Sequence, residues 1–249
     1  MVNKIVKYVN REMSWLSFNE RVLQEAADPS LPLLERLKFL GIFSSNQDEF
    51  FSVRVGTVHR MIDAGVKSSE TIGDSPKKTM KLIHKRVLQL RDKFDDVFSE
   101  IEKELQKANI FIINETERTQ QQQEFVREYF ISKVRPRLVP VMFRELQKFP
   151  YLKNQAVYLA VAMYKYRDPQ DFNYALIEVP ADVLPRFLPL PSDSGTQYII
   201  MLDDVIRFGL SNIFSIFDYD SISAYTIKLT RDAELDIEDD VMKSFFEKI

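Results

Sequence analysis

The pattern that most constrains the fold is a helical period that continues without a break for thirty residues, from Pro76 to Leu105. Apolar side chains recur there every three or four positions, at Ile83, Val87, Leu90, Phe94, Val97, Ile101 and Leu105. Thirty helical residues span about 45 Å. Because a helix with one apolar face needs partners along its length, the sequence predicts a helical bundle.

Shorter helical patterns precede this long one. Residues Ser17 to Glu20 fit a capping box, which places the start of a helix at Ser17. Pro32 suits the first turn of a second helix, and Gly41 suits its end. The segment "FSSNQDEFF", residues 43–51, then sets six polar residues between phenylalanines. We predict a junction between two helices at this polar segment.

The pattern changes near Asn109. The segment 109–113, "NIFII", predicts a short strand, and a Gln-rich helix follows it. Residues 156–166 and 172–180, on either side of a turn at 167–169, predict a hairpin, with further strands at 197–202 and 222–229. We therefore predict an α+β fold in which an all-helical N-terminal domain, 1–107, precedes an α+β head domain, 108–249, with a mainly antiparallel sheet.

Composition excludes several classes of function. The chain has 249 residues, no cysteine and a net charge of −3, so disulfides and thiolate metal sites are absent and nothing attracts nucleic acid globally. The two histidines, His59 and His84, lie on separate predicted helices and cannot form a histidine-rich metal site. No Walker A loop and no apolar run long enough for a transmembrane segment occurs. We expect a cytoplasmic protein without a nucleic-acid partner.

Two charged segments leave alternatives open. Lys77, Lys78, Lys81, Lys85 and Arg86 place cations at the start of the long helix, where they face the positive end of the helix dipole. This conflict slightly favours contact with an anion, and the alternative is a solvated face balanced by acidic residues farther along. The acidic run "RDAELDIEDD", 231–240, has the alternation of a strand with one wet face and does not match a calcium loop.

Residues 11–56, "REMSWLSFNERVLQEAADPSLPLLERLKFLGIFSSNQDEFFSVRVG", closely resemble the opening of bacterial polyphosphate kinase, and "TRDAELDI", 230–237, resembles the signature at the end of that family's second domain. The resemblance implies an enzyme that reversibly transfers the terminal phosphate of ATP to inorganic polyphosphate. In that family the phosphorylated histidine, the polyphosphate-binding cations and the Mg²⁺ ligands belong to C-terminal domains outside these residues. It also implies a homo-oligomer, a dimer or higher, formed through the head domain.

The resemblance therefore makes this chain the N-terminal and head domains, which we expect to be inactive alone. The last residues, "DVMKSFFEKI", look like a helix cut short, so we expect the native polypeptide to continue past Ile249. The competing hypothesis is a complete, non-catalytic module that binds a protein or a polyanion.

The family's nucleotide-contacting asparagine falls on Asn46, whose carboxamide offers the donor and acceptor that an adenine edge needs. Phe39 is a further candidate, because it could supply an aromatic face for the base of ATP or ADP. The alternative for Asn46 is a helix cap, with Glu49 three residues later. Ser44 or Ser45 could take the capping role instead.

Overall fold

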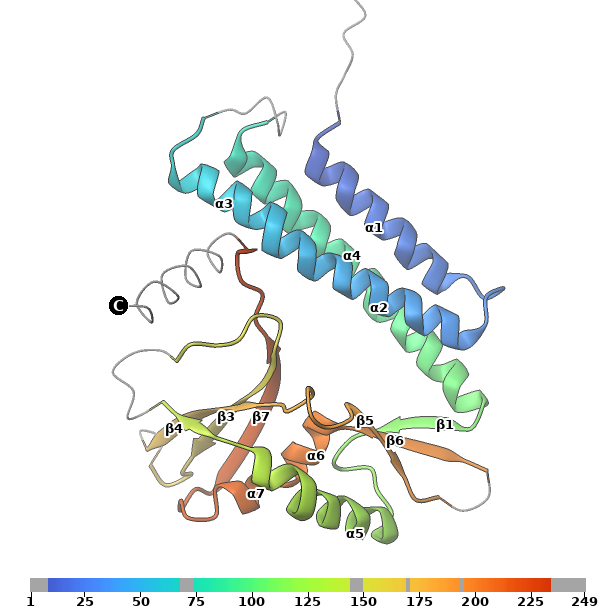
Figure 1. The fold of residues 1–249 in the computed structure, drawn as a ribbon, viewed down its shortest axis with the longest axis vertical. Coiled ribbons are helices and arrows are strands. Elements are labelled where there is room, and N and C mark those ends of the chain that lie inside the picture. Colours follow the sequence, from blue (N-terminus) through green and yellow to red (C-terminus); the bar gives the residue numbers. More distant parts are fainter. Residues whose placement is uncertain (1–8, 68–73, 144–149, 169–170, 193–194, 234–249) are drawn as a thin grey trace, which may run out of the picture. The chain divides into compact units, whose positions relative to one another are not determined.

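The computed structural model describes residues 9–67, 74–143, 150–168, 171–192 and 195–233 (Figure 1). The chain forms two compact units. One combines the residues up to Glu104 with those from Thr230 onwards, and the other runs from Leu105 to Leu229. The predicted domain boundary at residue 107 stays a proposal. None of the described helices is both long and apolar enough to span a membrane.

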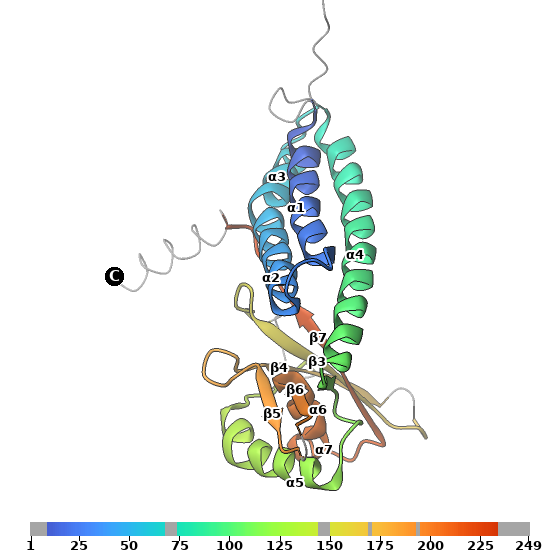
Figure 2. The same ribbon diagram turned by 90° about the vertical axis from the view of Figure 1, so that its right-hand side faces the viewer.

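The first unit is helical. Its elements are α1 (Arg11–Ala27), α2 (Leu33–Glu49), the π-helical segment η1 (Phe50–Val55), α3 (Gly56–Asp63) and α4 (Pro76–Lys107). The helices α1, α2 and α4 lie side by side in both views (Figures 1 and 2). Apolar residues from all of them form the core, including Leu16, Leu23, Leu40, Phe43, Val58, Ile83, Leu90 and Ile101. The long helix and the bundle predicted from the apolar period are confirmed.

The start of the first helix differs from the prediction. Asn10 is the N-cap, and its side-chain oxygen accepts hydrogen bonds from the backbone N–H groups of Glu12 at 3.0 Å and Met13 at 3.2 Å. Ser17 is already inside α1, where its hydroxyl donates to the Met13 carbonyl at 2.9 Å. The capping box at Ser17 is therefore wrong, because Asn10 satisfies the free donors two turns earlier.

The predicted junction at the polar segment is also wrong. Helical structure runs from Leu33 through η1 to Asp63 without a turn. Polar residues do not end a helix when they lie on its wet side, and Ser44 and Ser45 are exposed. The backbone instead widens, since the Gly56 N–H donates to the Phe51 carbonyl five residues earlier.

The second unit contains two sheets. The three-stranded sheet has the order β1 (Ile110–Ile113), β6 (Gln197–Met201), β5 (Phe187–Leu190), with β1 and β6 parallel. The four-stranded sheet is antiparallel, in the order β2 (Val141–Met142), β4 (Phe172–Glu178), β3 (Val157–Tyr164), β7 (Ser221–Lys228). The α+β class and the predicted hairpin of β3 and β4 are confirmed.

Helices pack against these sheets to form one core. They are α5 (Gln120–Tyr129), α6 (Leu202–Phe208) and α7 (Leu210–Ile213), with a π-helical segment η2 (Phe130–Val134) and a 3₁₀ turn η3 (Arg135–Arg137). A Cβ at Gly209 would lie 2.1 Å from the Phe130 ring, so only glycine permits this close packing. The acidic run 231–240 lies mostly outside the described residues, and no strand is formed at 231–233.

Candidate functional site

Asn46, the residue that the family resemblance assigns to the nucleotide base, lies in the last turn of α2 and is half-buried. It is not a helix cap, because the helix continues beyond it into η1 and α3. The capping alternative is therefore wrong. One N–H of the Asn46 carboxamide donates to a neighbouring side chain, and the groups around Asn46 decide what it can recognise.

Three carboxamides meet where α1 packs on α2. Asn46 Nδ2 donates to Asn19 Oδ1 at 3.1 Å. Asn19 is completely buried, and its own Nδ2 donates to the Phe43 carbonyl at 3.2 Å and to Gln47 Oε1 at 3.4 Å. With its oxygen and its amide both engaged, Asn19 fixes which group of Asn46 faces inward.

The same helix pair buries two polar atoms that have no hydrogen-bond partner among the described residues, Gln47 Nε2 and Glu12 Oε2. Glu12 is 1% exposed, and its Oε2 lies 3.7 Å from Arg54 Nη1, beyond hydrogen-bonding distance. Its other oxygen is 2.9 Å from Arg11 Nη2. Since buried polar groups are almost always paired, this interface retains unused hydrogen-bonding capacity.

Several aromatic residues of this unit lie on α1, α2 and the adjoining η1. Trp15 of α1 stacks on Phe50 with ring centroids 4.7 Å apart. Phe39 is half-buried on α2, seven residues before Asn46. Seven helical residues bring both side chains to the same face, about 10 Å apart along the axis. Phe39 and Asn46 therefore share one face of α2.

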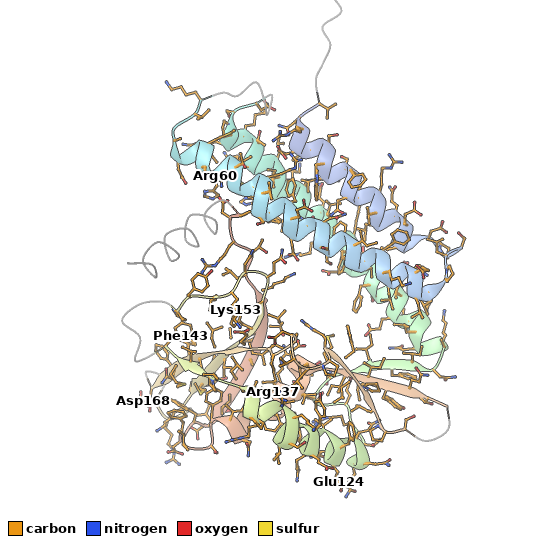
Figure 3. The ribbon with its side chains drawn as sticks, in the orientation of Figure 1. Arg60, Glu124, Arg137, Phe143, Lys153 and Asp168 are labelled. Carbon is orange, nitrogen blue, oxygen red and sulfur yellow. The ribbon has the colours of Figure 1, made fainter. Side chains whose placement is uncertain are left out.

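A second cluster in the helical unit joins η1 and α3 to the segment that follows β7. The Ser52 hydroxyl donates to the Arg231 carbonyl at 2.7 Å, and the Arg60 guanidinium forms an ion pair with Asp232. Figure 3 shows Arg60 on α3. A Cβ at Gly56 would lie 2.7 Å from the Asp232 carboxylate. Because Gly56 has no side chain, it leaves a space that the Asp232 carboxylate fills, and we call this space the Asp232 socket.

The α+β unit buries charges in a different arrangement. Asp203 and Asp204 of α6 are 5% and 8% exposed, and Arg207, one turn later, pairs with both. Thr226 donates to Asp203 at 2.9 Å, and Arg207 also donates to the Ala224 carbonyl at 3.2 Å. Burial raises the pKa of Asp204 to about 6, against the opposing pull of Arg207.

The cavities of the described residues lie away from Asn46. One in the helical unit, of about 240 Å³, is lined by residues that include Glu20, Lys93 and Asp96. One in the α+β unit, of about 470 Å³, has Arg137 and Lys153 in its wall (Figure 3). There Lys153 pairs with Glu178 at 2.6 Å, which raises the pKa of the lysine. In the smaller cavity Glu20 pairs with Lys93, and neither cavity lining includes Asn46.

Comparison with known families identifies the chain. Residues 8–113 match the model of the polyphosphate kinase N-terminal domain, and residues 121–249 match the polyphosphate kinase middle domain. The second match alone covers more than half of the 249 residues. The chain belongs to the polyphosphate kinase family.

Individual relatives agree with this assignment. The chain is 42% identical over 246 residues to the polyphosphate kinase of Vibrio cholerae, covering 97% of this chain and 34% of the relative. It is 38% identical over 244 residues to that of Escherichia coli, covering 96% and 35%. The crystal structure of polyphosphate kinase from Porphyromonas gingivalis matches with a TM-score of 0.79 and 32% identity, over 91% of this chain and 33% of that one. The chain thus spans about a third of the length of these polyphosphate kinases.

Sequence patterns missed several of the residues described above. The capping-box pattern places Asn19 at a helix start, whereas Asn19 lies buried inside α1. Its spacing of three residues from Leu16 and four from Leu23, both apolar, is the sequence signal that puts it on the buried face. No local sequence pattern around Ser52, Gly56 and Arg60 could identify Asp232 as their partner, because Asp232 lies 172 positions from Arg60.

Proposed function

We propose that this chain is the N-terminal part of a polyphosphate kinase that reversibly transfers the γ-phosphate of ATP to inorganic polyphosphate, and that Asn46 contacts the base of ATP or ADP. The observation that carries the proposal is the hydrogen bond from Asn46 Nδ2 to the buried Asn19. It engages one N–H of Asn46 and leaves its second N–H and its Oδ1 for a ligand. A donor beside an acceptor is the pattern that pairs with an adenine edge.

The chemistry itself is assigned to the part of the polypeptide beyond these residues. The two histidines, His59 of α3 and His84 of α4, are exposed and belong to separate helices, in no arrangement suited to a phosphorylated nucleophile. The described residues contain no group of three His, Asp or Glu side chains suited to a metal. We propose that the phosphohistidine and the Mg²⁺ ligands belong to the C-terminal domains. We also propose that the whole enzyme is cytoplasmic and that this chain alone is inactive.

Asn46 would form one wall of the base site. The cavity of the helical unit described above does not include it, and we propose that the opposite wall comes from another part of the full-length enzyme. Phe39, on the same face of α2, is proposed to add an aromatic contact to the same nucleotide. Recognition by an incomplete site agrees with the unpaired Gln47 Nε2 beside Asn46.

We further propose that the full-length enzyme forms a dimer or a higher homo-oligomer through the outer face of the four-stranded sheet. On this face lies a groove of about 440 Å³, whose lining includes Phe143, Ala160, Ala162, Tyr174 and Tyr225. Tyr174 and Tyr225 are 51% and 67% exposed. Exposed aromatic side chains gathered on one sheet face are typical of a protein interface.

The nucleotide contact is tested in the full-length enzyme with Asn46→Ala. Loss of a paired donor and acceptor should raise the KM for ATP by roughly tenfold with little change in kcat. Ser45→Ala, an exposed neighbour on the same helix, is the matched control and should leave the KM unchanged. A large fall in Tm with an unchanged KM would show that Asn46 serves only the fold.

The division of labour and the oligomer have separate tests. Synthesis of polyphosphate from ATP by the 249-residue chain alone would contradict the assignment of catalysis to other domains. For the oligomer, Tyr225→Arg in the full-length enzyme should shift sedimentation equilibrium toward the monomer. Phe187→Arg, an exposed position on the other sheet, should not. Equal behaviour of the two variants would exclude this sheet face.

A further inference from the structure

Three lysines of α4, Lys77, Lys81 and Lys85, form a row that we call the lysine stripe. They are spaced four residues apart, so they follow one face of the helix at intervals of about 6 Å. All three are exposed, and none forms an ion pair with any residue that the structure describes. The opposite face of this part of α4 is buried through Thr79 and Ile83.

The neighbouring cations of the same helix are paired. Lys78 lies 2.8 Å from Asp74, and Arg86 and Lys93 both reach Glu20. The hydrogen bond from Lys93 is the largest cause that lowers the pKa of Glu20. Carboxylates thus pair with the cations around the lysine stripe, whereas the three lysines of the stripe remain available to bind an anion.

Helix stability does not explain this arrangement of charge. Between residues 76 and 86 there are five cations and no carboxylate, whereas residues 87–107 carry six carboxylates and four cations. This distribution is opposite to the one that the helix dipole favours. Lysines four residues apart on one helix face also repel each other. A row of cations that the helix would be more stable without indicates a binding role.

We propose that the lysine stripe is a binding site for the inorganic polyphosphate chain, separate from Asn46. The choice of polyphosphate as the polyanion rests on the proposed function. A linear polyanion can follow a single row of lysines along a helix, each lysine acting as a point charge for phosphate oxygens. Single-stranded nucleic acid is the less suitable ligand, because its binding sites combine cations with aromatic side chains on which the bases stack. This face of α4 has no Phe, Tyr or Trp; its residues are Lys77, Lys81, His84, Lys85 and Leu88.

The test measures binding of fluorescently labelled, long-chain polyphosphate to the 249-residue chain by anisotropy. The triple variant Lys77→Gln, Lys81→Gln and Lys85→Gln should bind roughly tenfold more weakly at about 0.1 M salt. The slope of log K against log salt concentration should fall in magnitude by about 2. The control variant, Lys38→Gln, Lys103→Gln and Lys107→Gln, loses the same charge from exposed lysines elsewhere and should bind like the unchanged protein.

Further measurements separate the possible outcomes. The triple variant should melt at an equal or slightly higher temperature, because it relieves repulsion; a lower Tm would indicate a structural role and overturn the proposal. Equal weakening in the control variant would show an effect of net charge only. Single-stranded DNA that bound the stripe as tightly as polyphosphate would exclude the polyphosphate assignment. Asn46→Ala should not change polyphosphate binding, so failure of the nucleotide proposal remains distinguishable from failure of this one.

Discussion

Two buried polar clusters, one in each unit, differ in how completely their side chains are paired. In the α+β unit, Asp203 and Asp204 are surrounded by cationic and hydroxyl donors, with Arg207 pairing both. In the helical unit, the carboxamides of Asn19 and Asn46 are uncharged, and a neighbouring buried amide has no partner among the described residues. A cluster whose charges are paired offers few groups to a ligand, whereas an incompletely paired one retains groups that a ligand can use.

The largest expected effect comes from removing the cation of the complete cluster. Arg207→Met should lower the free energy of unfolding by about 3 kcal/mol, because it leaves the buried carboxylate of Asp204 without its cationic partner. Urea denaturation measures this loss. Arg167→Met, in the exposed turn between β3 and β4, should change it by less than about 0.5 kcal/mol. A loss below about 1 kcal/mol for Arg207→Met would break the contrast between the two clusters.

A smaller effect is expected within the helical unit. Asn19→Ala should cost about 2 kcal/mol, since it leaves the Phe43 carbonyl and Gln47 Oε1 without their donor. Asn46→Ala should cost less than about 1 kcal/mol, because Asn46 is only half-buried. A double-mutant cycle by thermal and urea unfolding gives their coupling. If Asn46 proved the more costly of the two, Asn19 would not be the residue that positions the other.

The pH dependence of stability should distinguish the clusters further. Burial raises the folded-state pKa of Asp204 to about 6 from its usual 3.8, so the folded protein binds this proton more tightly than the unfolded chain does. The contribution of Asp204 is therefore fully present below about pH 4 and is lost as pH rises through about 6. Asp204→Asn should remove this component from a stability profile over that range. An unchanged profile would show that Arg207 holds the carboxylate ionised throughout.

The smallest expected change in stability concerns the Asp232 socket. Gly56→Ala fills the space of the Asp232 carboxylate, while alanine favours the helix by up to about 1 kcal/mol. The unfolding free energy should thus stay within about 1 kcal/mol of the original. Limited proteolysis should nevertheless cut near Arg231 faster, because its anchoring to α3 is lost. Arg60→Met should accelerate the same cleavage, and unchanged cleavage in both variants would exclude the socket as an anchor.

Much of the secondary structure followed from local patterns. The period of apolar residues in α4 and the alternation in β3 and β4 reflect burial of one face, which every neighbouring residue in an element records. Helix starts were less predictable, since Asn10 and Ser17 are both good capping residues and only the packed helix selects one. The uninterrupted path through residues 43–51 was missed because the wider π-helical turn at η1 has no simple sequence signature.

The sequence by itself determined the α+β class, the long helix, the strands β1, β3, β4, β6 and β7, and the membership of the polyphosphate kinase family. Only the tertiary structure decided that Asn19 orients Asn46, that Arg207 forms ion pairs with two buried aspartates, and that Asp232 fills the space beside Gly56. The physical reason is the separation along the sequence over which each kind of signal acts. Periodicity records the environment of a residue's own element, whereas a hydrogen bond or ion pair depends on which distant side chain the packed core brings within about 3 Å.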